Sequence, residues 1–137
     1  MEYNFLLLED DKLSIKNDGK FLSLNDDNLF SLEAAYSLIF NDEIKVKNAI
    51  SSKALELLEN NEVVINFEKV SSALKELEGN KIIAHLNREN FRKISFPIFV
   101  RSEYLINYLK ISGLKFELSL FLDNSNFEML ELDSLYR

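Results

Sequence analysis

The hydrophobic and polar positions at the start of the chain alternate as they do in short antiparallel strands. An apolar segment at 3–8 is followed by segment 12–16, in which apolar and polar residues alternate, and by a returning segment at 20–24. A period of two is typical of strands with one buried face. The tripeptide 17–19 ends in glycine, which accepts the positive φ of a tight turn. The N-terminal part therefore predicts antiparallel strands.

Four later segments have the three- and four-residue spacing of amphipathic helices. These segments are 31–40, 51–58, 67–78 and 103–112. The predicted N-caps are Ser31, Asn66 and Ser102, and the predicted helix ends are Gly79 and Gly113.

The remaining apolar segments predict strands at 44–47, 81–86 and 94–100. Pro97 cannot donate a ladder hydrogen bond, so its strand is expected at a sheet edge or at a bulge. A closing hairpin is predicted from 115–122 and 127–132, and both of its strands are apolar on both faces. Such strands need cover on both sides. A second subunit or the helices of the chain itself would provide that cover.

Composition and charge restrict the class of protein. The 137 residues suffice for one domain or two small ones, and the absence of cysteine excludes disulfides, Cys-ligated zinc and thiol catalysis. No apolar run is long enough to span a bilayer, and the first residues do not resemble a secretory signal. A cytoplasmic protein is expected.

The net charge of −7 is unevenly distributed. Up to residue 80 the chain has eight Lys and Arg against 16 Asp and Glu, and from Lys81 onward it has eight against seven. All four arginines lie in the second part, so a contact with RNA is expected there if one exists. The alternative is that these charges only solvate the surface.

The sequence offers no self-sufficient active site. His85 is the only histidine and lies among apolar residues of a predicted strand, which is more typical of a structural side chain than of a base. The three glycines are isolated and form no phosphate-binding loop. Paired acidic residues fall at predicted turns, where they favour local hydrogen bonds. Neither a metal nor a cofactor is expected.

Several segments resemble parts of archaeal tRNA-splicing endonucleases. The strand 19–24, the segment Phe30–Ile39 (FSLEAAYSLI) and the strand 43–46 are similar, in that order, to the N-terminal domain of that family. Segment 67–83 looks like a helix-to-strand unit of the family, and 115–132 looks like its terminal strand, acidic turn and strand.

This resemblance implies an α+β fold, in which an N-terminal antiparallel sheet with helices (1–60) packs on a C-terminal nuclease-like mixed α/β unit (61–137). It also implies a Tyr, His and Lys catalytic triad. Segment 91–96 contains no Tyr, segment 95–100 contains no His, and only Lys115 matches. A non-catalytic, structural subunit of a heteromeric enzyme is therefore expected.

The resemblance further implies assembly with a catalytic endonuclease subunit, in a hetero-oligomer such as a tetramer, which cleaves precursor tRNA. Asp123 and Glu128 would enter a basic pocket of that partner. The remaining predicted interface residues are Phe121, Phe127, Met129, Leu130 and Leu132, and the candidate RNA-facing residues are Arg88, Arg92, Lys115 and Arg137. The alternative is a small interaction or adaptor module unrelated to RNA, and an enzyme using His85 and Lys115 is the third reading.

Overall fold

The computed structural model describes residues 3–41, 52–123, 125 and 127–131, which form a seven-stranded mixed sheet. The spatial order is β3-β2-β1-β4-β8-β5-β9, and β6 and β7 form a separate two-stranded sheet. The strands are β1 (Tyr3–Glu9), β2 (Lys12–Asn17), β3 (Lys20–Ser23), β4 (Tyr36–Phe40), β5 (Val63–Lys69), β6 (Leu74–Glu78), β7 (Lys81–Leu86), β8 (Arg92–Arg101) and β9 (Phe127–Glu131). The pairs β1–β4 and β5–β9 are parallel, and the other pairs are antiparallel.

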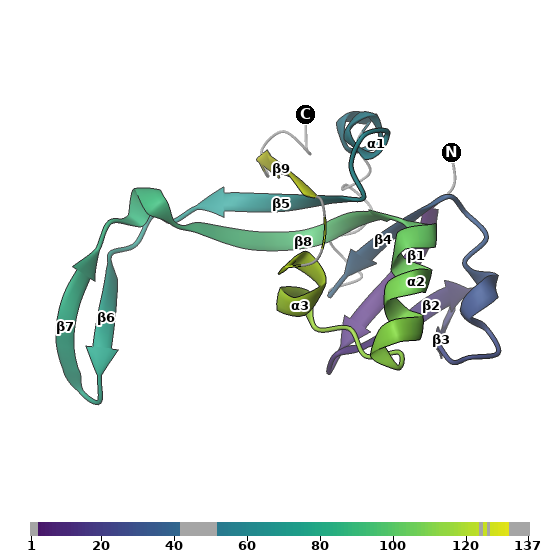
Figure 1. The fold of residues 1–137 in the computed structure, drawn as a ribbon, viewed down its shortest axis with the longest axis horizontal. Coiled ribbons are helices and arrows are strands. Elements are labelled where there is room, and N and C mark those ends of the chain that lie inside the picture. Colours follow the sequence, from purple (N-terminus) through teal and green to yellow (C-terminus); the bar gives the residue numbers. More distant parts are fainter. Residues whose placement is uncertain (1–2, 42–51, 124, 126, 132–137) are drawn as a thin grey trace.

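Helices cover both faces of the large sheet (Figure 1). Helix α1 (Ser52–Leu58) packs on one face, while α2 (Ser102–Ser112) and α3 (Leu118–Asp123) pack on the other. The central strands alternate between these two cores. In β8, for example, Ile98 and Val100 face α2 and α3, and Phe99 faces α1.

The predicted strands at 3–8, 12–16 and 20–24 are confirmed as β1, β2 and β3. The strand at 81–86 is β7, and the predicted helices 51–58 and 103–112 correspond to α1 and α2. Gly113 ends α2 in the left-handed conformation (φ 69°), as a glycine after a helix commonly does. The predicted strand at 44–47 lies outside the described residues.

The predicted helix at 31–40 is wrong. A single 3-10 turn at Leu29–Ser31 precedes the extended strand β4. Three consecutive residues of β4, Leu38, Ile39 and Phe40, are buried, because a central strand is covered on both faces. A short apolar run of this kind fits a buried strand as well as a helix.

The predicted helix at 67–78 is also wrong, because this stretch contains the end of β5, a connection and β6. The β-branched run Val63, Val64 and Ile65 starts β5 between β8 and β9, and the strand continues to Lys69. Asn66 is a fully buried strand residue and not a helix cap. Pairing of the end of β5 with β8, and of β6 with β7, therefore overrides the helical spacing.

The predicted closing hairpin does not form. Residues 118–123 form α3, and β9 pairs in parallel with β5. Phe116 and Phe121 pack with each other and with Tyr108 of α2, at centroid distances between 4.8 and 6.0 Å. This aromatic cluster holds α3 against the sheet. The apolar residues of the predicted strand 115–122 are therefore covered within the chain itself, by packing against α2.

Pro97 lies in β8, which is a central strand between β4 and β5, so the predicted edge position is wrong. The alternative prediction, a bulge, is confirmed. The register of β5 against β8 shifts between Val64 and Asn66, beside Pro97. The missing N–H of proline is accommodated at this irregularity.

A buried polar cluster joins three parts of the core. The Asn4 side-chain amide donates to the hydroxyls of Ser37 and Ser102 and to the carbonyl of Ala34, at 3.1 Å each. The two serine hydroxyls are 2.8 Å apart. Ser102 is therefore a network residue and not the predicted N-cap of α2, a position that Arg101 occupies.

The structure is an α+β arrangement in which one sheet takes strands from both sides of residue 60. The division into domains 1–60 and 61–137, and the packing of one on the other, stay predictions. Among the described residues, no helix combines the length and the apolarity needed to cross a membrane.

Asn4→Ala is expected to destabilise the protein by about 1–3 kcal/mol, because the carbonyl of Ala34 loses its hydrogen bond from the amide and the Ser37 and Ser102 hydroxyls keep only their bond to each other. Urea unfolding measures the change. The control Asn107→Ala changes an exposed residue of α2 and should alter stability by at most about 0.5 kcal/mol. Equal effects of the two substitutions would contradict the role of the cluster.

Tyr3→Phe is expected to flatten the pH dependence of stability between pH 10 and 12. Burial of the hydroxyl is the main cause that raises the pKa of Tyr3 from 10.0 to about 12, and the neighbouring Tyr36 contributes in the same direction. The unfolded chain therefore loses this proton first, and stability decreases as the pH rises from 10 to 12. The Tyr3 hydroxyl has no hydrogen-bond partner among the described residues, so its removal should cost nothing at pH 7. Urea midpoints across this pH range test both points.

Candidate anion-binding site at the base of a projecting arm

Strands β6 and β7 form an arm that projects from the end of β5 and β8 (Figure 1). A pocket of about 570 Å³ lies at its base. The pocket, called the arm-base pocket below, is lined by Lys69, Val70, Ser71, Arg88, Glu89, Asn90 and Arg92. Two of the four arginines of the chain therefore meet at one place.

Local structure fixes the positions of these cations. Lys69 ends β5 and is paired in register with Arg92, which begins β8. Arg88 begins a 3-10 turn that ends at Asn90. Asn87 caps this turn, because its side-chain oxygen accepts a hydrogen bond from the Glu89 N–H at 3.1 Å. An Asn at this position commonly starts such a turn.

Backbone carbonyls orient both guanidinium groups. Nη1 of Arg88 donates to the carbonyl of Ser71 at 2.8 Å. Nη1 of Arg92 donates to the carbonyls of Glu89 and Phe91 at 2.7 Å each, and its guanidinium carbon lies 5.9 Å from the ring centroid of Phe67. Each guanidinium has five N–H donors, so donors remain on both side chains after these contacts.

The pocket is locally positive in an acidic protein. It has three cationic side chains against the single carboxylate of Glu89, although the chain has a net charge of −7. An arginine fork matches the geometry of a phosphate or carboxylate group, and a nearby lysine adds a point charge. The arrangement is suited to binding an anion.

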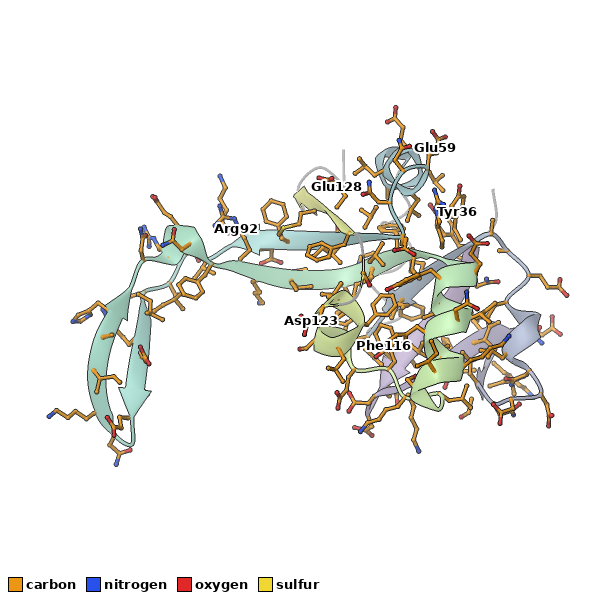
Figure 2. All side chains as sticks on the ribbon, in the orientation of Figure 1. Tyr36, Glu59, Arg92, Phe116, Asp123 and Glu128 are labelled. Carbon is orange, nitrogen blue, oxygen red and sulfur yellow. The ribbon has the colours of Figure 1, made fainter. Side chains whose placement is uncertain are left out.

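A second hollow, of about 590 Å³, lies where β4, α1 and α2 meet, near Tyr36 and Glu59 (Figure 2). Arg101 lines it, but its guanidinium already donates to the carbonyls of Leu58 and Glu59 at the end of α1. The hydroxyl of Ser102 is held in the buried cluster. These polar groups maintain the fold, so this hollow is the weaker candidate.

The structure separates Lys115, a further predicted RNA-facing residue, from Arg88 and Arg92. Lys115 lies near the β1–β2 turn, 3.6 Å from Glu117, and Arg137 is outside the described residues. Figure 2 shows Arg92 where the arm leaves the sheet, away from Asp123 at the end of α3. His85 is exposed on β7 and contacts Nζ of Lys75 through Nδ1.

The predicted interface residues lie on two elements in place of one hairpin. Phe121 is buried in the core and Asp123 ends α3, whereas Phe127, Glu128, Met129 and Leu130 belong to β9. Leu132 is outside the described residues. Phe127 and Met129 are about 40% exposed, so they remain available for a partner, and the interface stays a prediction.

Sequence reasoning missed Lys69 and Ser71, because both lay in the predicted helix 67–78. The order of polar segments along the chain could have indicated the pocket. A polar connection follows the strand that ends at Lys69, and a second polar connection, which contains Arg88 and leads to Arg92, follows β7. The antiparallel hairpin between them brings both connections together. Within the described parts of the chain, no group of three or more acidic or histidine side chains is arranged to hold a metal ion.

No protein-family model and no curated protein matches the sequence. Solved structures do match the fold, and those compared are cytidylyltransferases. The 2-C-methyl-D-erythritol 4-phosphate cytidylyltransferase of Thermus thermophilus matches with a TM-score of 0.56 and 15% identity, over 81% of this chain and 58% of that one. The 4-diphosphocytidyl-2C-methyl-D-erythritol synthase of Anaerococcus prevotii matches with 0.54 and 15%, over 77% and 53%. The bifunctional IspDF of Campylobacter jejuni matches with 0.53 and 17%, over 81% and 30%.

These similarities show that this chain shares its fold with part of the compared structures, and it spans just over half the length of the first two. The expected membership of the tRNA-splicing endonuclease family is therefore wrong. The function of a structural subunit in tRNA splicing is wrong for the same reason, because it depended on that resemblance. The quoted segments consist mainly of common apolar residues, and two of them adopt strands or turns where the resemblance implied helices.

Proposed function

We propose that this chain binds a phosphorylated small molecule, with its anionic group in the arm-base pocket. The observation that carries the proposal is the convergence of Lys69, Arg88 and Arg92 on one pocket of an acidic chain. The three side chains come from β5, the turn before β8 and β8 itself, so the antiparallel pairing of β5 and β8 preorganises them.

The contacts at the pocket favour binding of moderate strength. The backbone carbonyls that hold the two arginines reduce the conformational entropy lost on binding. The site is open to water and contains Glu89, which opposes an incoming anion and so limits the affinity. An affinity in roughly the micromolar to millimolar range is expected.

The named substrates of the structural neighbours support this class of ligand. The Thermus thermophilus enzyme is named for a 4-phosphate of a sugar alcohol, and both enzyme names contain a cytidylyl group. The proposal concerns binding and not group transfer, because the three isolated glycines of these 137 residues provide no glycine-rich phosphate loop.

A cytoplasmic location fits a phosphorylated metabolite and is part of the proposal. That the chain works together with a partner also stays a prediction. The identification of that partner as a splicing endonuclease depended on the family resemblance and has no other support.

Titration with cytidine triphosphate or 2-C-methyl-D-erythritol 4-phosphate is expected to shift the backbone NMR signals of residues 69–71 and 88–92. Lys69→Gln and Arg88→Gln should each weaken binding by about five- to twentyfold, because each removes a charge-assisted contact. The effect of Lys69→Gln on binding is easier to interpret, because Arg88→Gln also removes the hydrogen bond from the guanidinium to the carbonyl of Ser71.

Lys115→Gln is the matched control, because it removes one surface charge outside the arm-base pocket and should leave the affinity unchanged. Cytidine and 2-C-methyl-D-erythritol, which lack phosphate, should not bind measurably. No shift at these residues with millimolar phosphorylated ligand, or equal binding of the unphosphorylated compounds, would refute the proposal.

A further inference from the structure

Exposed apolar side chains lie on the large sheet beside the arm-base pocket. They come from its three neighbouring strands β8, β5 and β9, and they are Ile94, Phe67, Phe127 and Met129. Phe127, Ile94 and Met129 are 40%, 38% and 38% exposed, and Phe67 is half-buried. We refer to these four residues as the apolar strip. A contiguous apolar surface next to a polar pocket is typical of a binding site.

The strand register places the apolar strip on the face of the sheet that α2 and α3 partly cover. Paired residues share a face, and so do residues two apart along a strand. Met129 is paired with Ile65, which packs in the core with α2 and α3, and Phe127 lies two residues before Met129. Phe67 lies two residues beyond Ile65. Its partner across the ladder is Ile94.

Two of the three cations of the arm-base pocket share this face. Lys69 lies two residues beyond Phe67 on β5, and Arg92 lies two residues before Ile94 on β8. Lys69 and Arg92 are paired with each other. The guanidinium carbon of Arg92 is 5.9 Å from the ring centroid of Phe67. The cationic pocket and the apolar strip therefore form one continuous surface.

The opposite face of the same strand ends is polar. Glu68 of β5 is paired there with Lys93 of β8, and the hydroxyl of Ser95 donates to the Glu68 carboxylate at 2.9 Å. At this end of β5 and β8, the exposed apolar side chains thus lie on the side that carries the pocket cations. A ligand that reaches from the pocket onto the sheet meets carbon atoms on that side.

We propose that the ligand of the arm-base pocket is an amphiphile, namely a phosphate monoester of a flexible apolar chain. Its phosphate contacts Lys69, Arg88 and Arg92, and its chain lies along the apolar strip. The inference rests on the proposed function and names the part of the ligand that the pocket itself does not hold. One such molecule neutralises the local positive charge and also removes the apolar strip from water.

The charge of the whole chain favours a single amphiphile over the surface of a lipid bilayer. The net charge is −7, so a bilayer rich in anionic lipids repels most of the molecule. A single phosphate group lies within the local field of the three cations and is little affected by distant carboxylates, because salt screens them.

Titration calorimetry with n-alkyl phosphates, each below its critical micelle concentration, tests the proposal. Complete transfer of a methylene group out of water strengthens binding about fourfold, and a chain on an open surface keeps one side in water, so about twofold per methylene is expected. Octyl phosphate should therefore bind about ten- to twentyfold more tightly than butyl phosphate. Octanol, which lacks the phosphate, should not bind measurably.

Substitutions in the apolar strip separate the chain from the phosphate. Ile94→Ser and Met129→Ser should each weaken binding of octyl phosphate by about three- to tenfold, because each removes part of the surface under the chain. Both variants should bind methyl phosphate as the wild type does. Because both residues are partly exposed, the fold should persist, which an unchanged far-ultraviolet circular dichroism spectrum checks.

Two control variants match these changes in chemistry. Lys93→Gln removes a cation next to Arg92 but on the opposite face, and Ile111→Ser removes an apolar residue of α2 that is 88% exposed and lies outside the apolar strip. Neither should change the affinity for octyl phosphate.

The possible failures have different meanings. Binding of methyl and octyl phosphate with equal affinity would overturn the amphiphile and leave the proposed function intact; this is the result expected if a second copy or another protein covers the apolar strip. Binding of none of the phosphates would remove the proposed function itself. Cosedimentation with vesicles of phosphatidylserine and phosphatidylcholine, without binding of monomeric octyl phosphate, would replace the single amphiphile by a membrane surface.

Discussion

Strand β8 is the element on which both the core and the arm-base pocket depend. Its ten residues span about 33 Å, which is longer than the core requires. Ile98, Phe99 and Val100 are fully buried and alternate between the two cores. The other end extends beyond the core together with β5 and begins at Arg92. Because one strand runs through both regions, burial of its last residues fixes the place from which the arm projects.

The C-terminal end of β8 is held by polar contacts that a sequence does not reveal. Arg101 donates to the last carbonyls of α1, and Ser102 joins the buried cluster with Asn4 and Ser37. The partners of Arg101 and Ser102 lie between 42 and 98 residues away in the sequence. Sequence reasoning predicted a local role for Ser102, as a helix cap, since spacing alone shows only nearby partners. The long-range contact prevails because a buried hydroxyl without a partner is costly.

The sequence predicts elements best where only one pattern fits. Alternation identified β2, the short apolar segments on either side of it indicated β1 and β3, and Gly113 marked the end of α2. The predictions failed at β4, a central strand whose buried apolar residues also match helical spacing. They failed again from the end of β5 to β6, where half-buried and exposed strand residues match that spacing too. Part of the arm-base pocket was predictable, because Arg88 and Arg92 stood out as cations in the less acidic half. The contribution of Lys69 was not predictable, since Lys69 reaches the pocket only through the pairing of β5 with β8.

The start of the sheet explains why the arm base is the favoured anion site. In open α/β folds, phosphate groups commonly bind where a strand passes through a short loop into a helix, whose first N–H groups bind the anion. Here β1 turns back after Asp10 and Asp11 directly into the antiparallel strand β2, and two carboxylates occupy the turn where a helix N-terminus would otherwise begin. The pocket beside that turn is lined by Lys12 and Lys115 as well as by the two carboxylates, so its charges balance, whereas the arm-base pocket has three cationic side chains against one carboxylate.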